Sequence, residues 1–143
     1  MRAANSLGMT VEVFSYGQSD DIAVALQRIA ARKVQMLVVV FDGVIEPRLR
    51  DITDFAVAHK ILSIGSATLF TAVGGALYYG SNLQEIVDCA VSFVDRILRG
   101  AKPADLAVEQ PTNFDLIINL KTMRLIGLPV PQSVLLRATE LIQ

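Results

Sequence analysis

The sequence predicts an α/β layered fold built around a mainly parallel sheet, and three observations support this prediction. The chain has 143 residues, 52% of them hydrophobic, which is enough for one domain with a sizeable core. Its hydrophobic pattern switches repeatedly between short apolar runs and stripes of helical period. Residues 36–41 are apolar at every position, which is typical of a central parallel strand buried on both faces.

Five segments have the pattern of strands, and the first four are each followed by small or turn-forming residues. The first, residues 10–14, ends at Ser15-Tyr16-Gly17, and the third ends at Gly65-Ser66. In full, the predicted strands are residues 10–14, 36–41, 61–64, 76–79 and 114–120. On the strand 76–79, Tyr78 and Tyr79 alternate, so one ring should face the core and the other should face outward.

The predicted helices follow these strands and carry ordinary start and stop signals. Ser19 is a candidate N-cap for the helix that follows, in which Ile22, Leu26, Ile29 and Ala30 line one face. Pro47 suits the first turn of a helix that reaches His59. Asn82 and Glu85 have capping-box spacing before the longest helix, which should end at Gly100. Further helices are expected in residues 2–7, before Gly127, and after Pro131 through Val134, Leu135, Ala138, Leu141 and Ile142.

The start of the sequence reads as the interior of a βα unit. Residues 2–7 resemble the last two turns of a helix that Gly8 ends. In a doubly wound sheet such a helix follows a strand, and no strand precedes it. We therefore expect an incomplete sheet with an unpaired edge, and such an edge favours pairing with another chain as a homo-oligomer.

Composition and charge exclude several classes of function. With 13 Lys+Arg against 14 Asp+Glu, the net charge is −1, and the chain lacks the excess of basic residues that nucleic-acid binding requires. The longest apolar run, residues 36–41, is far too short to span a membrane. A single cysteine, Cys89, excludes an intrachain disulfide and a metal site built from cysteines. The first residues lack the apolar core of a signal peptide, which leaves a cytoplasmic location open.

The residues that could support catalysis have simpler structural interpretations. His59 is the only histidine and lies in the last turn of a predicted helix, where an imidazole suits the helix dipole. Asp20-Asp21 precedes a helix, so capping is favoured over metal binding, and Cys89 lies beside an apolar helical stripe as a packed thiol. We therefore predict no catalytic residue, no metal site and no cofactor, and a small α/β enzyme is only a minor alternative.

Polar and glycine residues follow the ends of the predicted strands. They are Ser15-Tyr16, Asp42-Gly43, Gly65-Ser66-Ala67-Thr68 and Tyr79-Gly80-Ser81-Asn82. Ligands of open α/β sheets bind beyond the carboxyl ends of the strands, so this group suits a small polar or zwitterionic molecule. Ordinary strand-to-helix turns would have the same composition, and both interpretations stay open on these residues alone.

The second half of the chain resembles a known family. The run GAKPADLAVEQPTNFDLIINLKTMRLIGLPVP is similar to the C-terminal part of the ABC-transporter substrate-binding proteins that include the tryptophan/tyrosine-type uptake receptors. The upstream segments RAANSLGMTVEVF and SDDIAVALQRIAARKVQMLVVVFD resemble the same family, so the likeness extends over essentially all 143 residues.

This resemblance implies a type I periplasmic binding-protein fold, in which a small solute is held between two Rossmann-like lobes. Residues 1–143 would form a single domain, the C-terminal lobe, with a three-layer α/β/α arrangement, and residues 113–143 would be its returning hinge strand and terminal helices. The implied ligand residues are Asp42, Gly43, Ser66, Thr68, Tyr79 and Gly80. Asp42 would take an ammonium or hydroxyl group, Ser66 and Thr68 would form hydrogen bonds, and Tyr79 would pack against an apolar part of the ligand.

Two positions depart from the family pattern and leave the ligand's identity open. Phe41-Asp42 stands where the family commonly has Pro-Asp, and Ser81 stands where it often has proline. The resemblance implies a truncated, non-enzymatic solute-binding component of an ABC uptake system, with an amino acid as a typical ligand, a membrane permease as partner and an extracytoplasmic location. The alternative is a cytoplasmic small-molecule sensor, an effector-binding module, or a remnant of the same fold without a role in transport.

Overall fold

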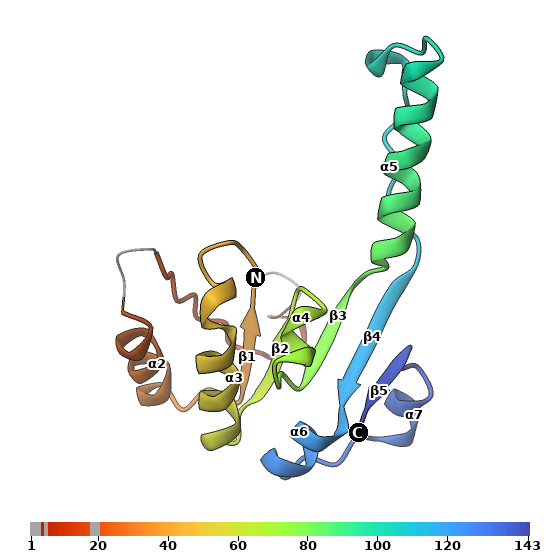
Figure 1. The fold of residues 1–143 in the computed structure, drawn as a ribbon. Helices are drawn as coiled ribbons and strands as arrows, with labels where there is room; N and C mark the ends of the chain where they lie inside the picture. Colours follow the sequence, from red (N-terminus) through yellow and green to blue (C-terminus); the bar gives the residue numbers. More distant parts are fainter. Residues whose placement is uncertain (1–3, 5, 18–20) are drawn as a thin grey trace.

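A five-stranded, mostly parallel sheet forms the centre of the computed structural model, which describes residues 4, 6–17 and 21–143. The strands lie side by side in chain order, β1-β2-β3-β4-β5 (Figure 1). Only β3 and β4 run antiparallel to each other among the described strands, and the other three pairs are parallel. The bounds are β1 Met36–Val39, β2 Leu62–Gly65, β3 Leu77–Ser81, β4 Phe114–Asn119 and β5 Glu140–Ile142. The predicted α/β class with a mainly parallel sheet is confirmed.

Helices connect these strands and begin close to the predicted positions. The α-helices are α2 Ile22–Ala31, α3 Leu49–Ala58, α4 Leu69–Ala72, α5 Leu83–Leu98, α6 Leu120–Ile126 and α7 Gln132–Leu135. Two 3₁₀ turns, η1 Glu46–Arg48 and η2 Pro103–Asp105, each hold a proline in the first turn. Asp21 caps α2, because its Oδ1 accepts a hydrogen bond from the backbone N–H of Ala23 at 2.8 Å. The other predicted capping residues, Ser19 and Asp20, lie outside the described residues.

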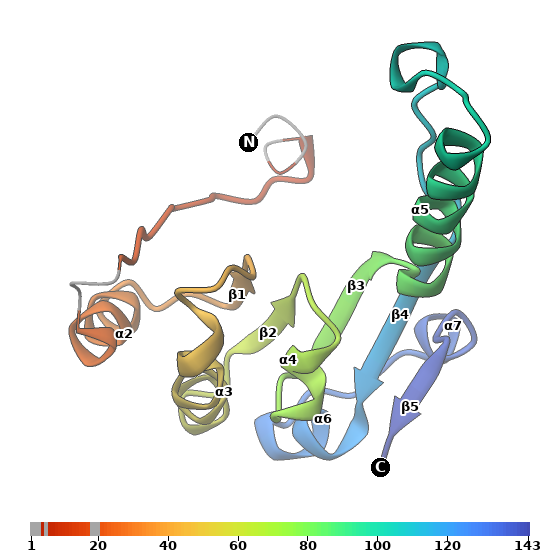
Figure 2. The same ribbon diagram turned by 45° about the horizontal axis from the view of Figure 1, so that its top comes forward.

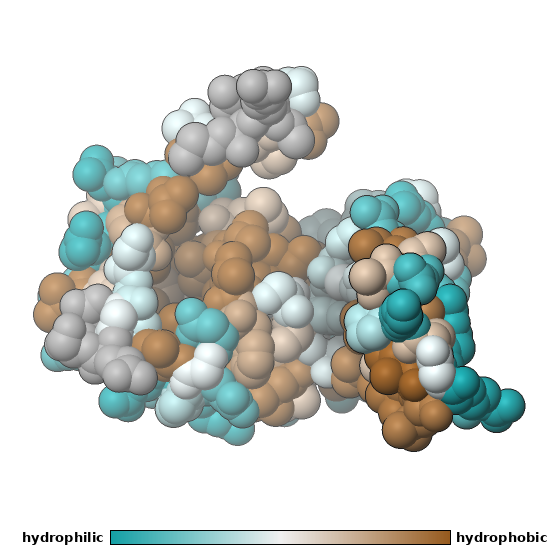
Figure 3. Space-filling model, turned by 90° about the horizontal axis from the view of Figure 1, so that it is seen from above, coloured by the Kyte–Doolittle hydropathy of each residue, from teal (hydrophilic) through white to brown (hydrophobic). Residues whose placement is uncertain are grey.

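Two hydrophobic clusters hold the sheet and its helices together. The first joins α2 and α3 to β1 and contains Leu26, Ile29, Leu49, Ile52 and the fully buried Phe70. The second joins α6 to β3 and β4 through Ala76, Ile118, Met123 and Ile126. The prediction that residues 36–41 form a central strand buried on both faces is wrong, because β1 lies at the edge of the described sheet, and its Met36 and Val38 are exposed while Val39 is buried. Viewed from above, hydrophobic residues gather over the middle of the molecule (Figure 3).

The segment 10–14, predicted to be a strand, has no secondary structure. It runs as an extended trace away from β1 (Figure 2), and its Val11 and Val13 are exposed. Glu12 forms an ion pair with Arg32 just beyond α2, with 3.3 Å between the charged atoms, and Phe14 packs against the first cluster. An extended segment becomes a strand only when its backbone groups pair with a neighbour, and no described strand lies beside this one.

The prediction that the C-terminal helix continues through Ile142 is also wrong beyond its first turn. α7 ends at Leu135, and Leu141 and Ile142 belong to β5, parallel to β4. Thr139 begins this pairing, since its N–H donates to the Leu116 carbonyl at 2.8 Å and its Oγ1 accepts from the Leu116 N–H at 3.0 Å. A short apolar run is compatible with both a helix and a strand. Residues 140–142 form a strand because the neighbouring edge of β4 is available for pairing.

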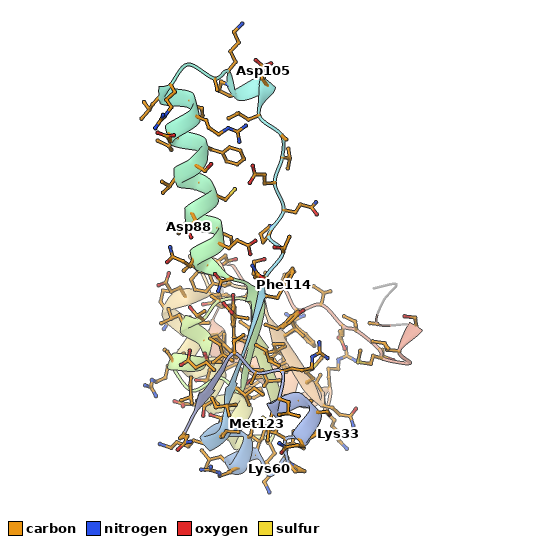
Figure 4. The ribbon with its side chains drawn as sticks, turned by 90° about the vertical axis from the view of Figure 1, so that its right-hand side faces the viewer. Lys33, Lys60, Asp88, Asp105, Phe114 and Met123 are labelled. Atoms are coloured by element: carbon orange, nitrogen blue, oxygen red, sulfur yellow. The ribbon has the colours of Figure 1, made fainter. Side chains whose placement is uncertain are left out.

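The longest helix, α5, stands away from the sheet. Together with the returning residues 101–113 it forms a protruding arm, and only β3 and β4 connect this arm to the rest of the molecule (Figures 1 and 4). None of the residues of α5 is buried. Cys89, expected to be a packed thiol, is therefore only partly buried, and Phe114 at the base of the arm is half exposed. Within the part of the chain that the structure describes, no helix is both long and apolar enough to cross a membrane.

Candidate ligand-binding site

The carboxyl ends of β1, β2 and β3 lie at one edge of the sheet, because these three strands are parallel. A side-chain hydrogen bond ties the loops after β1 and β2 together, since the backbone N–H of Phe41 donates to Ser66 Oγ at 2.8 Å. The backbone N–H of Ser66 donates in turn to the carbonyl of Val39 at 3.1 Å. The two loops that carry four of the six predicted ligand residues are thus brought together.

Asp42 shapes the loop after β1 and keeps one carboxylate oxygen available. Its Oδ1 accepts hydrogen bonds from the backbone N–H groups of Val44 at 2.9 Å and Ile45 at 2.8 Å. No described residue donates a hydrogen bond to Oδ2, and both Asp42 and Gly43 are exposed. A carboxylate held in this way presents a negative charge in a fixed direction, which suits an ammonium group or a hydroxyl donor.

Ser66 and Thr68 place two hydroxyl groups on the loop after β2, at the same edge of the sheet as Asp42. Both residues are exposed. The Ser66 oxygen already accepts the Phe41 N–H, so its hydrogen is available to a ligand. Thr68 precedes α4, and its carbonyl accepts from Thr71 Oγ1 at 2.8 Å while its side chain makes no capping bond.

Tyr79 lies at the level of Ser66 on the neighbouring strand, because the register pairs Gly65 with Tyr78 one position earlier. Tyr79 is 51% exposed, and its ring stacks on Phe114, with 5.7 Å between ring centroids and 16° between planes. Tyr78 points the other way and is buried, so the predicted alternation of the two tyrosines is confirmed. The exposed stack offers an apolar surface to a ligand side chain.

Gly80 has a structural reason to be glycine. A Cβ at this position would lie 2.6 Å from the Tyr78 hydroxyl oxygen, and that hydroxyl donates to the carbonyl of Ser81 at 3.1 Å. Gly80 also pairs with Asp115 across β3 and β4. The missing side chain therefore lets the Tyr78 ring fold back against the strand.

A polar group at the start of the arm was not among the predicted ligand residues. Asn82 Nδ2 donates to Asp115 Oδ2 at 2.9 Å, joining the end of β3 to the start of β4. Burial, with a smaller contribution from the negative charge of Asp115, raises the pKa of Tyr78. Sequence spacing offers no signal for this pair, because 33 residues separate Asn82 from Asp115.

The remaining candidates lie away from this edge. His59 follows α3, where its Nδ1 lies 2.9 Å from the Phe55 carbonyl and its ring lies against Phe55. One cavity of about 380 Å³ is lined by Glu12, Phe14, Arg28, Ala31 and Arg32, and another of about 330 Å³ by Ala30, Lys33, Val34, His59 and Ile61. Neither cavity includes a predicted ligand residue. The described residues contain no group of three or more His, Cys, Asp or Glu side chains able to hold a metal ion.

Comparisons with known proteins give one consistent likeness. A family model described as ABC transporter substrate binding protein matches residues 1–142. The crystal structure of an ABC domain in complex with L-Trp from Streptococcus pneumoniae is similar, with 27% identity and a TM-score of 0.87 over 99% of this chain and 48% of that one. A conserved domain protein from Vibrio cholerae has 26% identity and a TM-score of 0.84 over 98% of this chain and 47% of that one.

A third solved structure supports the fold alone. The ligand-free, open structure of CD0873, a substrate binding protein with adhesive properties from Clostridium difficile, has 17% identity and a TM-score of 0.73, over 99% of this chain and 47% of that one. A comparison with curated proteins found no match. The chain spans about half the length of the solved structures that it matches.

Proposed function

Since the chain belongs to the family of ABC transporter substrate-binding proteins, we propose that it is a solute-binding component of an uptake transporter and takes a small polar solute at the strand-end edge. An amino acid is the solute class that best suits the edge. The carboxylate of Asp42 would take the ammonium group, the hydroxyls of Ser66 and Thr68 would bond to the carboxylate, and the Tyr79–Phe114 stack would contact the side chain.

One observation carries this proposal: the loops after β1 and β2 are held together by the bond from Phe41 N–H to Ser66 Oγ. This bond holds the loop that carries Asp42 against the loop that carries Ser66 and Thr68, at the edge where ligands of parallel α/β sheets bind. The solved Streptococcus pneumoniae domain holds L-Trp, so an aromatic amino acid is the first ligand to test.

The other parts of the proposal follow from family membership. The chain would supply one lobe, in the position of the C-terminal lobe, with residues 113–143 as its returning strand and terminal helices, and the solute would lie between two lobes. The complete receptor would work outside the cytoplasmic membrane and deliver its solute to a membrane permease. One lobe leaves half of the ligand exposed, so we expect this chain to bind in the millimolar range rather than tightly.

Equilibrium dialysis with three related probes tests the roles of the polar groups. L-Tryptophan carries both charged groups, tryptamine lacks the carboxylate, and indole-3-propionate lacks the ammonium. We expect L-tryptophan and tryptamine to bind and indole-3-propionate not to bind. Asp42→Asn keeps the oxygen that caps the loop but removes the charge, so it should weaken L-tryptophan binding at least about tenfold.

Thr68→Val and a matched control complete this test. Thr68→Val removes an exposed hydroxyl without changing the shape of the side chain, and it should weaken L-tryptophan but leave tryptamine unchanged. Asp54→Asn removes a charge from an exposed position on α3 and should change neither. Equal binding of all three probes, or unchanged L-tryptophan binding in Asp42→Asn, would contradict the assigned roles.

A further inference from the structure

The end of the molecule opposite the arm carries a cluster of basic side chains. Lys33 and Lys60 lie at this end, far from Asp105 at the tip of the arm (Figure 4). The chain crosses this end in the segments that lead into β1, β2 and β3 and in the one that follows β4, which are residues 32–35, 59–61, 73–76 and 120–131. These segments contain three lysines, two arginines and no Asp or Glu, in a chain whose net charge is −1. Positive charge is therefore concentrated here, and we call this part of the surface the basic end.

Two of these lysines occupy backbone positions that glycine adopts more easily. Lys33 follows the end of α2 and Lys60 follows the end of α3, with left-handed φ angles of +51° and +54°. Their backbone N–H groups donate to the carbonyls of Ala30 and Val57, at 3.2 and 3.1 Å. These bonds cap the helix ends without the ammonium groups. Both side chains are exposed, and neither forms an ion pair with a described residue.

The helix dipole does not account for the whole cluster. A lysine near the C-terminal end of α2 or α3 complements that dipole. Lys121 instead lies in the first turn of α6, where the dipole disfavours a cation. Lys121 and Arg124 are both exposed, and so are Leu125 and Leu128 on the same segment. Basic residues next to exposed apolar ones are typical of surfaces that bind at a membrane interface.

We propose that the basic end binds the surface of an anionic phospholipid bilayer. Its ammonium and guanidinium groups contact lipid phosphates, and Leu125 and Leu128 enter the headgroup layer. Lys33 and His59 line the cavity of about 330 Å³ between the loops that lead into β1 and β2. This cavity takes one lipid phosphate beside the Lys33 ammonium group.

The spread of the cations favours a bilayer over a single phosphate ion. They lie across the ends of four neighbouring strands, β1 to β4. Adjacent strands are about 4.8 Å apart, so the cluster spans about 15 Å, over which a bilayer presents several headgroups.

The opposite end of the sheet has the opposite charge. The strand-end edge carries Asp42 and Glu46, which an anionic surface repels. The bilayer therefore contacts the basic end and leaves the strand-end edge and the arm facing away from it. A second lobe at the strand-end edge leaves the basic end free, and in this respect the inference rests on the proposed function.

Co-sedimentation of the full chain with lipid vesicles tests the proposal. We expect the chain to bind vesicles of phosphatidylcholine with about 30% phosphatidylglycerol, and not to bind vesicles of phosphatidylcholine alone. Raising sodium chloride from about 0.1 M to about 0.5 M should release the chain, because salt screens the attraction. Equal binding to both kinds of vesicle, or binding to neither, would overturn the proposal.

Glycine variants locate the contact without disturbing the fold. Lys33→Gly and Lys60→Gly suit the left-handed backbone, so the far-ultraviolet circular dichroism should be unchanged. Each should weaken binding to the anionic vesicles about fivefold. Arg50→Gln and Lys102→Gln remove the same charge from exposed positions outside the basic end and should leave this binding unchanged. Equal losses in the two pairs would show that net charge alone attracts the chain, which would overturn the assignment to this end.

Inorganic phosphate separates a lipid surface from a free ion as the occupant. Millimolar phosphate at constant ionic strength should leave vesicle binding unchanged, since one ion does not replace several headgroups. Release of the chain by phosphate would indicate a site for the free ion and would overturn the bilayer as the occupant. Vesicle binding is measured without solute and solute binding without vesicles, so this proposal and the proposed function can fail independently.

Discussion

Single side chains determine how the arm joins the sheet, and Glu85 is the clearest case. One Glu85 carboxylate oxygen accepts from the backbone N–H and the hydroxyl of Thr112, at 3.1 and 2.9 Å, and the other accepts from the Asn113 N–H at 2.9 Å. These bonds, led by the one from the Asn113 backbone, lower the pKa of Glu85 below its usual value of about 4.3. The returning segment is thus fixed to α5 by a charged group.

This lowered pKa predicts a pH-dependent attachment of the arm. A carboxyl with a depressed pKa in the folded state stabilises that state above its unfolded pKa, and this stabilisation disappears as pH falls through the folded pKa. We expect the amide protons of Thr112 and Asn113 to lose protection from exchange as the pH falls below about 4. Glu85→Gln should remove this pH dependence, while Asp88→Asn on the same helix should retain it. A flat pH profile in the wild type would contradict the role of Glu85.

Side chains whose partners lie within a few residues follow local rules of spacing. The capping role of Asn82 and the opposite directions of Tyr78 and Tyr79 follow from spacing alone and are confirmed. Glu85 was expected to complete a capping box with Asn82, and instead it bonds to residues 27 and 28 positions away. Such partners depend on where β4 returns, which local spacing does not indicate. Whether Asp42, Ser66 and Thr68 bind a ligand stays a prediction.

At the scale of elements, the junction between β4 and α6 depends on one buried amide. Asn119 Oδ1 accepts from the Thr122 N–H at 3.0 Å and caps α6, while Nδ2 donates to the Thr71 carbonyl at 3.3 Å. Its side chain thus joins α6 to α4. Replacing it leaves the Thr122 N–H and the Thr71 carbonyl without this partner in a buried place.

We expect Asn119→Ala to lower the free energy of unfolding by about 2 kcal/mol. Urea denaturation followed by circular dichroism measures this change. Asp21→Ala, which removes an exposed N-cap from α2, should lower it by no more than about 1 kcal/mol, because water can replace the lost bond. Equal losses of unfolding free energy in the two variants would show that the burial of Asn119 does not increase its contribution to stability.

The correctly predicted elements are those whose start and stop residues and hydrophobic pattern all lie within or next to the element itself. The capped helix after Asn82 and the glycine stop at Gly127 each carry their own pattern, and Gly127 has the left-handed φ of +77° that favours glycine. The apolar run at 36–41 correctly predicts a strand but wrongly predicts a central one, because β1 lies at the edge of the described sheet with one face exposed. The segment 10–14 and residues 140–142 carry a weaker pattern. Whether they form strands depends on a neighbour, and a neighbour is present only for residues 140–142.

For the whole molecule, the α/β sheet was predicted, but the protruding arm was not. The apolar stripe of α5 predicts that one face is buried somewhere, and it does not indicate that no described residue covers that face. The chain spans about half the length of the solved structures that it matches. The hydrophobic pattern of α5 therefore predicts an apolar face but does not identify what packs against it.

The strand-end edge is proposed to bind a small zwitterionic solute. A nuclear magnetic resonance titration of the uniformly ¹⁵N-labelled chain with L-tryptophan, into the millimolar range, tests it most directly. We expect saturable shifts confined to the amides of residues 42–43, 66–68 and 79–80. No shift, or shifts centred instead on the cavity lined by Glu12 and Arg28, would contradict the account.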